Sequence, residues 1–193
     1  MERILLASAS PRRSEALSAL GFPIAVRPAD VDESLRDDEP VARRVRSLAA
    51  DKARAVAGTA GQGDPRWVLG ADTLVAVEDR VLGKPRDRAE ATAHLALLSG
   101  REHTVHSGLA LVDRRSGDVL EAASATLVEF LHLSETEIEW YLDSGEWEGV
   151  AGSYRIQERA ALFAARVDGS YSGVVGLPLA VLYGMLRTAG YRF

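Results

Sequence analysis

The sequence of 193 residues predicts a mixed α/β fold, in which one sheet holds both parallel and antiparallel strands. Short apolar runs and helix-periodic segments follow one another along the chain, which is typical of this class. Two long strand-like runs, 104–112 and 119–130, are separated only by a turn and therefore predict an antiparallel pair. The length fits one domain or two lobes that share one core, so we expect residues 1–193 to form a single domain with two lobes.

Each element of the N-terminal half has its own local signal. Ile4–Ala7 is a short apolar run typical of a buried strand, and the helix that follows is marked by Ser10 at its start and Gly21 at its end. The elements expected next are a strand over 22–26, a helix over 40–57, a strand over 67–70 and a hairpin over 74–82. The glycine-rich segment 58–65 is the best candidate for a flexible connection.

Capping signals mark the helices of the C-terminal half. Asp87 with Glu90, and Ser134 with Glu137, have the spacing of a capping box. They predict helices over 87–98 and from 134 to the stop at Gly145. The remaining expected elements are the two long strands, a strand over 162–167 and a terminal helix over 178–189.

Charge and composition exclude several classes of protein. The net charge of −5 argues against a broad nucleic-acid or membrane-surface footprint, so an anion site would have to be local. The absence of cysteine excludes disulfides, cysteine-ligated zinc and thiol nucleophiles. No apolar run has the length of a signal peptide or a membrane span. We therefore expect a cytoplasmic protein with no nucleic-acid or membrane partner.

Lysine is rare in this chain, because only two of the 23 lysines and arginines are lysines, Lys52 and Lys84. Keeping lysine in so arginine-rich a chain suggests that the compact ammonium is needed at these positions. Lys52 falls in line with Val45, Leu48 and Val56, so it either reaches out to solvent or points at a negative group inside the fold. Lys84 stands in a turn-like Gly-Lys-Pro segment. Chance and biased codon usage explain either lysine alone, whereas the pair favours a function.

The segment Ser8-Ala9-Ser10-Pro11-Arg12-Arg13 predicts an anion site. Two arginines in the first turn of a helix oppose the helix macrodipole unless an anion docks at that end. The N–H groups, the serine hydroxyls and the guanidinium groups would then converge on the anion. The alternative is a surface arginine pair with ordinary helix capping.

Three acidic residues form a second candidate. We expect Asp32 and Glu33 in a loop and Asp72 at the end of a strand, where sites commonly collect in α/β folds. Carboxylates together with phosphate oxygens hold Mg²⁺ or Mn²⁺, and a carboxylate can also act as general base toward water. Taken singly, each acid is better explained as a turn former or a solvated charge, so the inference depends on the anion site and the two lysines.

Other motifs in the sequence are weaker evidence for a functional site. Gly83-Lys84 is not a Walker A motif, because no glycine precedes it at the required spacing and Pro85 replaces the Ser or Thr. His103 and His106 would face opposite sides of a strand, so we expect structural or surface roles for the histidines. The amide of Gln157 can donate and accept at a pyrimidine edge, although glutamine is usually polar surface.

Taken together, these motifs resemble the Maf family of nucleoside triphosphate pyrophosphatases over nearly the whole chain. The matching segments are 6–13, 32–33, 48–53, 69–73, 83–85, 98–100, 156–157, 169–172 and 175–179. The resemblance implies hydrolysis of a nucleoside triphosphate to the monophosphate and pyrophosphate with a divalent cation, Mg²⁺ or Mn²⁺. It also implies an elongated two-lobed mixed sheet flanked by helices, with a central cleft similar to the inosine triphosphatase architecture, and a possible homodimer.

The resemblance also assigns roles and a substrate branch. Asp72 matches the proposed proton acceptor, and Arg12, Thr73 and Gln157 match positions of substrate choice. Pro-Arg-Arg, Ala-Asp-Thr and Ile-Gln resemble the dTTP/UTP branch, whereas the 7-methyl-GTP branch resembles Pro-Trp-Arg, Ser-Asp-Gln and a Ser-Glu pair. The expected site comprises Asp72, Lys52, Lys84 and Glu33 as catalytic groups, Ser8, Arg12, Arg13, Thr73 and Gln157 as substrate-binding groups, and Glu33 and Asp72 as metal ligands.

Two departures and two alternatives accompany this expectation. Val150 stands where relatives usually carry a lysine, and Glu158 stands where they usually carry a glycine. The expected function is hydrolysis of dTTP, UTP or modified pyrimidine triphosphates. The alternatives are a 7-methyl-GTP pyrophosphatase and a nucleotide-binding regulator of septum formation with little catalysis.

Overall fold

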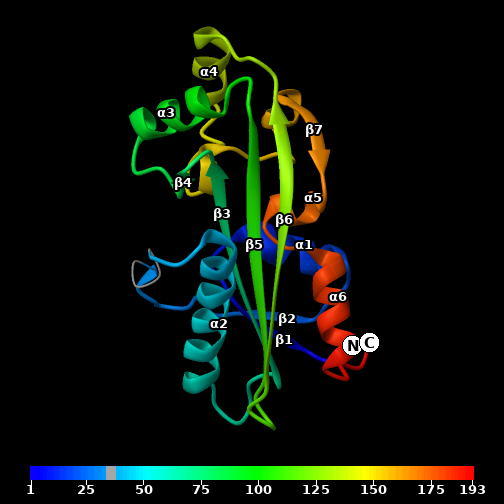
Figure 1. Ribbon diagram of the computed structural model, residues 1–193. Helices are drawn as coiled ribbons and strands as arrows, with labels where there is room; N and C mark the ends of the chain where they lie inside the picture. The colour runs from blue at the N-terminus through cyan, green and yellow to red at the C-terminus, as the bar shows by residue number, and fades with distance from the viewer. Residues whose placement is uncertain (34–37) are drawn as a thin grey trace. The chain divides into compact units, whose positions relative to one another are not determined.

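The computed structural model describes residues 1–33 and 38–193 (Figure 1). The strands are β1 (Ile4–Ala7), β2 (Ile24–Val26), β3 (Trp67–Val77), β4 (Arg80–Leu82), β5 (Glu102–Asp113), β6 (Val119–Phe130) and β7 (Ala164–Asp168). The helices are α1 (Pro11–Ala19), α2 (Val41–Thr59), α3 (Arg88–Leu98), α4 (Glu135–Leu142), α5 (Tyr171–Val175) and α6 (Leu179–Thr188), with the 3₁₀ segments η2 (Ala151–Ser153) and η3 (Arg159–Leu162).

The strands of the described chain form one mixed sheet. Its order is β2-β1-β3-β5-β6-β7, and β4 pairs with β3 off this path. β1 runs parallel to β2 and β3, whereas β4 is antiparallel to β3 and β7 is antiparallel to β6. The structure therefore confirms the mixed α/β class.

The chain divides into two compact units. The first holds residues 1–72, 107–124 and 176–193, and the second holds 73–106 and 125–175. β3, β5 and β6 each contribute residues to both units. The expectation of a single domain stays a prediction.

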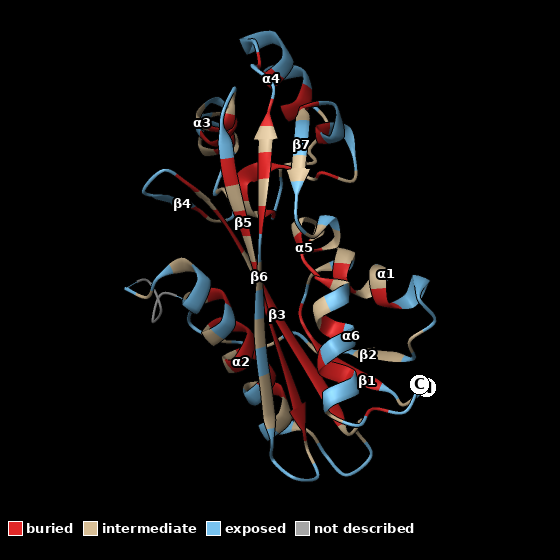
Figure 2. Cartoon of the chain, turned by 45° about the vertical axis from the view of Figure 1, so that its right-hand side comes forward, coloured by how far each residue is buried: buried red, intermediate tan, exposed pale blue. Residues whose placement is uncertain are grey.

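In the first unit, helices cover both faces of the sheet. Successive side chains of a strand point to opposite faces, and β1 follows this rule. Ile4 and Leu6 pack with residues of α1 and α6 in one cluster, whereas Leu5 and Ala7 pack with residues of α2 in another. Figure 2 shows β1 and this part of β3 as buried, which is expected for strands covered by helices on both sides.

The second unit has a single core in which α3 and α4 pack with β3, β5 and β6. Both predicted caps are present. The Asp87 side chain accepts the backbone N–H of Glu90, and Ser134 and Glu137 form a complete capping box at α4. No helix in the described part of the chain is long and apolar enough to cross a membrane.

Two expectations about the chain path are wrong. β3 does not end at Gly70 but continues to Val77, so Asp72 lies inside a strand. The segment 58–65 is not a loose connection, because the Arg114 guanidinium donates to the carbonyl oxygens of Ala60, Gly61, Asp64 and Pro65 at 2.8–3.0 Å. A guanidinium that binds four carbonyls fixes the loop to the end of β5.

Candidate functional site

Two glycines let helix α2 lie directly on the sheet of the first unit. A Cβ at Gly70 would stand 2.1 Å from the Ala49 carbonyl oxygen, and one at Gly108 would stand 2.1 Å from the Val45 carbonyl oxygen. Real Cβ atoms do not approach this closely, so only glycine allows the backbones to meet here. This contact sets the height of α2 above β3, and with it the position of Lys52.

Lys52 joins the two predicted metal ligands. Its Nζ lies 2.6 Å from Asp72 Oδ1 and 2.7 Å from Glu33 Oε1. Lys52 and Asp72 are buried, with 9% and 5% of their surface exposed, whereas the Glu33 side chain is 46% exposed. The lysine therefore points inward at negative groups, which decides between the two possibilities that its sequence position left open.

One oxygen of Asp72 has no hydrogen-bond partner among the described residues. Asp72 Oδ2 is buried and accepts no hydrogen bond from the described residues. A buried carboxylate oxygen without a donor is unfavourable unless something else supplies the partner. A water molecule or a cation at this oxygen would satisfy it.

The donor set suits a divalent cation bound through its substrate. Two carboxylates converge here, and Mg²⁺ is usually held by one or two carboxylates together with phosphate oxygens and water. The described residues contain no group of three or more histidine, cysteine, aspartate or glutamate side chains that could hold a metal ion alone. Glu33 and Asp72 therefore fit a metal that arrives with a triphosphate rather than one held by protein ligands only.

Arg13 is a buried residue that joins three segments of the site by hydrogen bonds. Its Nη1 donates to Ser8 Oγ at 2.8 Å and to the Ala71 carbonyl oxygen at 2.9 Å, and its Nε donates to the Gly176 carbonyl oxygen at 2.8 Å. Burial lowers the pKa of Arg13 to about 10, an effect that nearby Asp72 opposes, so the guanidinium is charged at neutral pH. Arg13 thus ties the start of α1 to the residue before Asp72.

The N-terminus of α1 is built as an anion site would require. Ser10 occupies the N-cap and Pro11 the first turn, as predicted, but the Ser10 side chain makes no cap hydrogen bond. Instead the Ser10 backbone N–H donates to Ser8 Oγ at 3.2 Å. Arg12 is half-buried in the first turn. An anion at this end would meet a helix terminus that the Ser10 side chain does not cap.

The other predicted site residues lie in the second unit. Lys84 is exposed and makes no ion pair with the described residues, while Thr73 and Gln157 are half-buried. Val150, at the departing position, is buried with 2% exposure, and Glu158 pairs with Arg155 at 3.5 Å. The structure brings together Ser8, Arg13, Ala71 and Gly176, and separately Glu33, Lys52 and Asp72, within the first unit.

The sequence interpretation missed the residues that support these side chains. The close approach of α2 to the sheet requires Gly70 and Gly108, and Arg13 donates to the carbonyl oxygen of Gly176. The sequence patterns predicted none of these roles. A signal was present for the first of them, since Ala49 and Ala53 lie one helical turn apart and are small enough to admit a strand. The carbonyls that Arg13 binds have no signal in the sequence.

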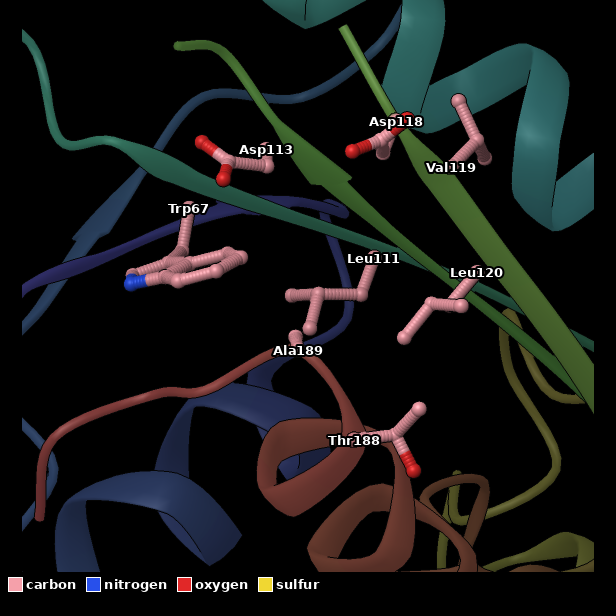
Figure 3. A pocket seen from close by; sticks show the side chains of 8 residues that line it. All are labelled: Trp67, Leu111, Asp113, Asp118, Val119, Leu120, Thr188 and Ala189. Atoms are coloured by element: carbon pink, nitrogen blue, oxygen red, sulfur yellow. The ribbon is translucent and has the colours of Figure 1, made fainter. Parts of the chain in front are cut away.

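A pocket of about 300 Å³ also lies in the first unit, at the start of β3 (Figure 3). It is lined by Trp67, Leu111, Asp113, Asp118, Val119, Leu120, Thr188 and Ala189, and none of these is a predicted site residue. It has two carboxylates but no lysine or arginine among its lining residues, so it lacks the cations that a triphosphate requires. The anion-binding residues therefore point to the Asp72 region and not to this pocket.

Two solved structures are distantly similar to this chain. A nucleoside-triphosphatase (dITP/XTP pyrophosphatase) from Mycobacterium abscessus is 15% identical, with a TM-score of 0.39 over 68% of this chain and 75% of that chain. The Ham1 protein of Staphylococcus aureus is 12% identical, with a TM-score of 0.41 over 67% and 72% of the two chains. We draw no conclusion about this chain from similarities at this level.

Sequence relatives are much closer. Proteins named dTTP/UTP pyrophosphatase from Moorella thermoacetica and Novosphingobium aromaticivorans are 48% and 49% identical. The first alignment covers 98% of this chain and 96% of the relative, and the second covers 97% and 92%. The profile of the Maf-like protein family matches residues 3–189. With a family match over nearly its full length and relatives of this identity, the chain belongs to the Maf family.

Proposed function

We propose that the protein is a nucleoside triphosphate pyrophosphatase that hydrolyses dTTP and UTP to the monophosphate and pyrophosphate. The observation that carries the proposal is the buried contact of Lys52 with Asp72 and Glu33, beside an Asp72 oxygen that has no partner in the described chain. The names of the relatives from Moorella thermoacetica and Novosphingobium aromaticivorans supply the substrates.

Asp72 is the proposed general base. Its Oδ2 accepts a proton from a water molecule, and the water oxygen forms a bond to the α-phosphorus. The bond from the α-phosphorus to the bridging oxygen of the β-phosphate breaks, and pyrophosphate leaves. Lys52 holds the other oxygen, Oδ1, at 2.6 Å and so fixes the direction in which Oδ2 points. Most of the rate enhancement in such a reaction comes from positioning and charge stabilisation.

The remaining residues of the first unit bind the phosphates in this proposal. Arg12 and the open N-terminus of α1 attract the triphosphate, and Arg13 keeps the Ser8 hydroxyl and Ala71 in place. Glu33 and Asp72 would hold Mg²⁺ or Mn²⁺. When bound, the cation supplies a Lewis acid that neutralises phosphate oxygens.

Thr73, Lys84 and Gln157 are proposed substrate contacts on the family resemblance. The Lys84 ammonium would neutralise phosphate charge. It is exposed, and no carboxylate of the described residues pairs with it and so competes with a phosphate. The Gln157 amide would recognise the pyrimidine edge, since it can donate and accept together. Thr73 would contribute to substrate choice.

Release of pyrophosphate from dTTP, UTP, CTP and 7-methyl-GTP, each with Mg²⁺, Mn²⁺ or EDTA, tests the proposal. We expect turnover of dTTP and UTP that EDTA abolishes. Replacing Asp72 by Asn should lower kcat by about a hundredfold or more, because it removes the base but keeps the shape. Unfolding in urea checks that the variant is folded.

Three outcomes would contradict the proposal. Preference for 7-methyl-GTP would move the protein to the other branch of the family. Tight binding of dTTP without pyrophosphate release would favour a regulator that acts through partners. Near wild-type turnover by the folded Asp72→Asn variant would refute the role of Asp72.

A further inference from the structure

A strained turn in the second unit lies next to the proposed phosphate-binding lysine. Gly152 and Ser153 are consecutive residues in the left-handed region, with φ of 70° and 63°. Among the described non-glycine residues, only Ser153 and Glu78 have a positive φ. Glu78 lies in the hairpin turn between β3 and β4, where this conformation is common, whereas Ser153 is fully buried. A residue with a Cβ keeps this backbone only where its surroundings enforce it.

A histidine of α3 makes the contact that keeps Ser153 in this conformation. His94 Nδ1 lies 2.8 Å from Ser153 Oγ, and both side chains are buried. Burial lowers the pKa of His94, and the Glu90 carboxylate one turn earlier opposes this effect. The imidazole is therefore neutral at pH 7 and bonds the hydroxyl as a neutral group. α3 is a capped helix whose side chains Leu95 and Leu98 are part of the core, so it forms a rigid support for this bond.

The Gly152-Ser153 turn holds the backbone immediately before Lys84. The Gly152 N–H donates to the Gly83 carbonyl oxygen at 3.1 Å. Gly152 also packs closely on β3, since a Cβ at this position would stand 2.7 Å from Val75 Cγ2. The peptide bond that joins Gly83 to Lys84 is thus fixed by a turn that His94 fixes.

The other end of the turn is anchored independently. The Tyr154 hydroxyl lies 2.8 Å from His103 Nε2, and the Tyr154 ring packs on Phe130 with centroids 4.8 Å apart. The backbone after the turn therefore stays in place without His94. Loss of the His94 contact would release the Gly152 side of the turn alone, toward Gly83.

We propose that His94 is a positioning residue that acts through Ser153 and Gly152 to place Lys84 for phosphate binding. This inference rests on the proposed function, because it gives Lys84 its task. His94 touches neither substrate nor reacting atoms. Its contribution is the orientation of Lys84, an exposed cation that makes no ion pair with the described residues.

The test compares four variants. His94→Leu removes the bond, and Ser153→Gly removes it while accepting the left-handed backbone, so the second variant stays informative where the first fails to fold. His94→Asn places an amide atom near the position of Nδ1 and should restore function. His132→Leu is the matched control, since His132 bonds Ser99 Oγ at 3.2 Å elsewhere in the same unit.

Turnover of dTTP gives the first readout. His94→Leu and Ser153→Gly should lower kcat by about tenfold, a fraction of the hundredfold that a misplacement of about 1 Å can cause. His94→Asn and His132→Leu should stay within about twofold of wild type. In a Lys84→Ala background, adding His94→Leu should cause no further loss, because residues that act as a unit are not additive. A further tenfold loss in that background would overturn the proposal.

Hydrogen exchange gives a readout that needs no activity. The Gly152 amide, which donates to Gly83, should exchange at least tenfold faster in His94→Leu and Ser153→Gly than in wild type or His132→Leu. Unchanged exchange in Ser153→Gly would show that packing alone holds the turn and would overturn the inference. A wild-type protein that hydrolyses no triphosphate would refute the proposed function, and the assignment of a task to Lys84 with it, while the exchange rates would still decide whether His94 holds the turn.

Discussion

The close approach of α2 to the sheet can be tested by one added methyl group. In Gly70→Ala, the new Cβ would lie 2.1 Å from the Ala49 carbonyl oxygen and 2.9 Å from the Ala53 nitrogen, whereas real Cβ contacts begin near 3.0 Å. Both clashing atoms belong to the helix backbone, which cannot rotate away as a side chain can. The helix must therefore retreat from β3 by roughly 1 Å, which overpacking data place at about 1–3 kcal/mol of unfolding free energy.

The same retreat should weaken the proposed active site. It would stretch the contact of 2.6 Å between Lys52 Nζ and Asp72 Oδ1 beyond the length of a charge-assisted hydrogen bond. A misplacement of about 1 Å can cost about a hundredfold in rate, so we expect kcat/KM for dTTP to fall by between about tenfold and a hundredfold. Urea unfolding and pyrophosphate release on the same preparation measure the two effects.

Gly58→Ala is the matched control because Gly58 lies in the same helix and a Cβ there meets nothing within 4 Å. It should leave turnover unchanged and raise the unfolding free energy by up to about 1 kcal/mol, from helix propensity. Wild-type stability together with wild-type turnover in Gly70→Ala would refute the reasoning. It would show that α2 adapts without moving Lys52.

Three further predictions concern single contacts. Lys52→Arg should lower kcat by at least about tenfold, because Lys52 is buried on α2 and the larger planar guanidinium does not fit the space that the compact ammonium fills; full activity would remove the case for lysine. Burial lowers the pKa of His103 to about 4, so the unfolded chain binds a proton at this residue more readily than the folded protein does. The free energy of unfolding therefore falls as the pH drops from 6.5 toward 4. His103→Gln should therefore reduce the loss of unfolding free energy between pH 7 and pH 4 by about 3 kcal/mol, and an unchanged difference would contradict this. Arg114→Lys should cost about 1–2 kcal/mol in urea unfolding with turnover unchanged, since an ammonium cannot bind the four carbonyls of 60–65 together; equal midpoints would assign the loop's order to other contacts.

Local signals in the sequence predicted the helices and turns well. The Ser134 capping box and the Asp87 cap both form, and Gly21, Gly100 and Gly145 all take the left-handed conformation after a helix. These features are decided within a few residues of the chain, so the sequence is sufficient to recognise them.

Features that depend on distant contacts were not predictable in the same way. Ala71-Asp72-Thr73 resembles the end of a strand, but β3 continues through it, from its pairing with β1 up to Gly70 to its pairing with β4 from Val75. The glycine-rich 58–65 segment was expected to be flexible, and only the folded chain brings Arg114 to its carbonyls. For the site, Lys52 and Asp72 could be named from the sequence, but their contact, the hydrogen bonds of Arg13 and the need for Gly70 could not.

The burial of Lys52 is hard to explain by stability. Replacing a buried ion pair by apolar residues of similar size is often neutral or stabilising, because charges lose their hydration on burial. Lys52 is surrounded on α2 by buried alanines and leucine, so an apolar residue would suit the packing. The Asp72 oxygen next to this contact has no donor among the described residues. A fold gains nothing from such a group by itself. A water molecule or a cation at this oxygen would supply the missing partner, and the proposed hydrolysis uses a water molecule at this place.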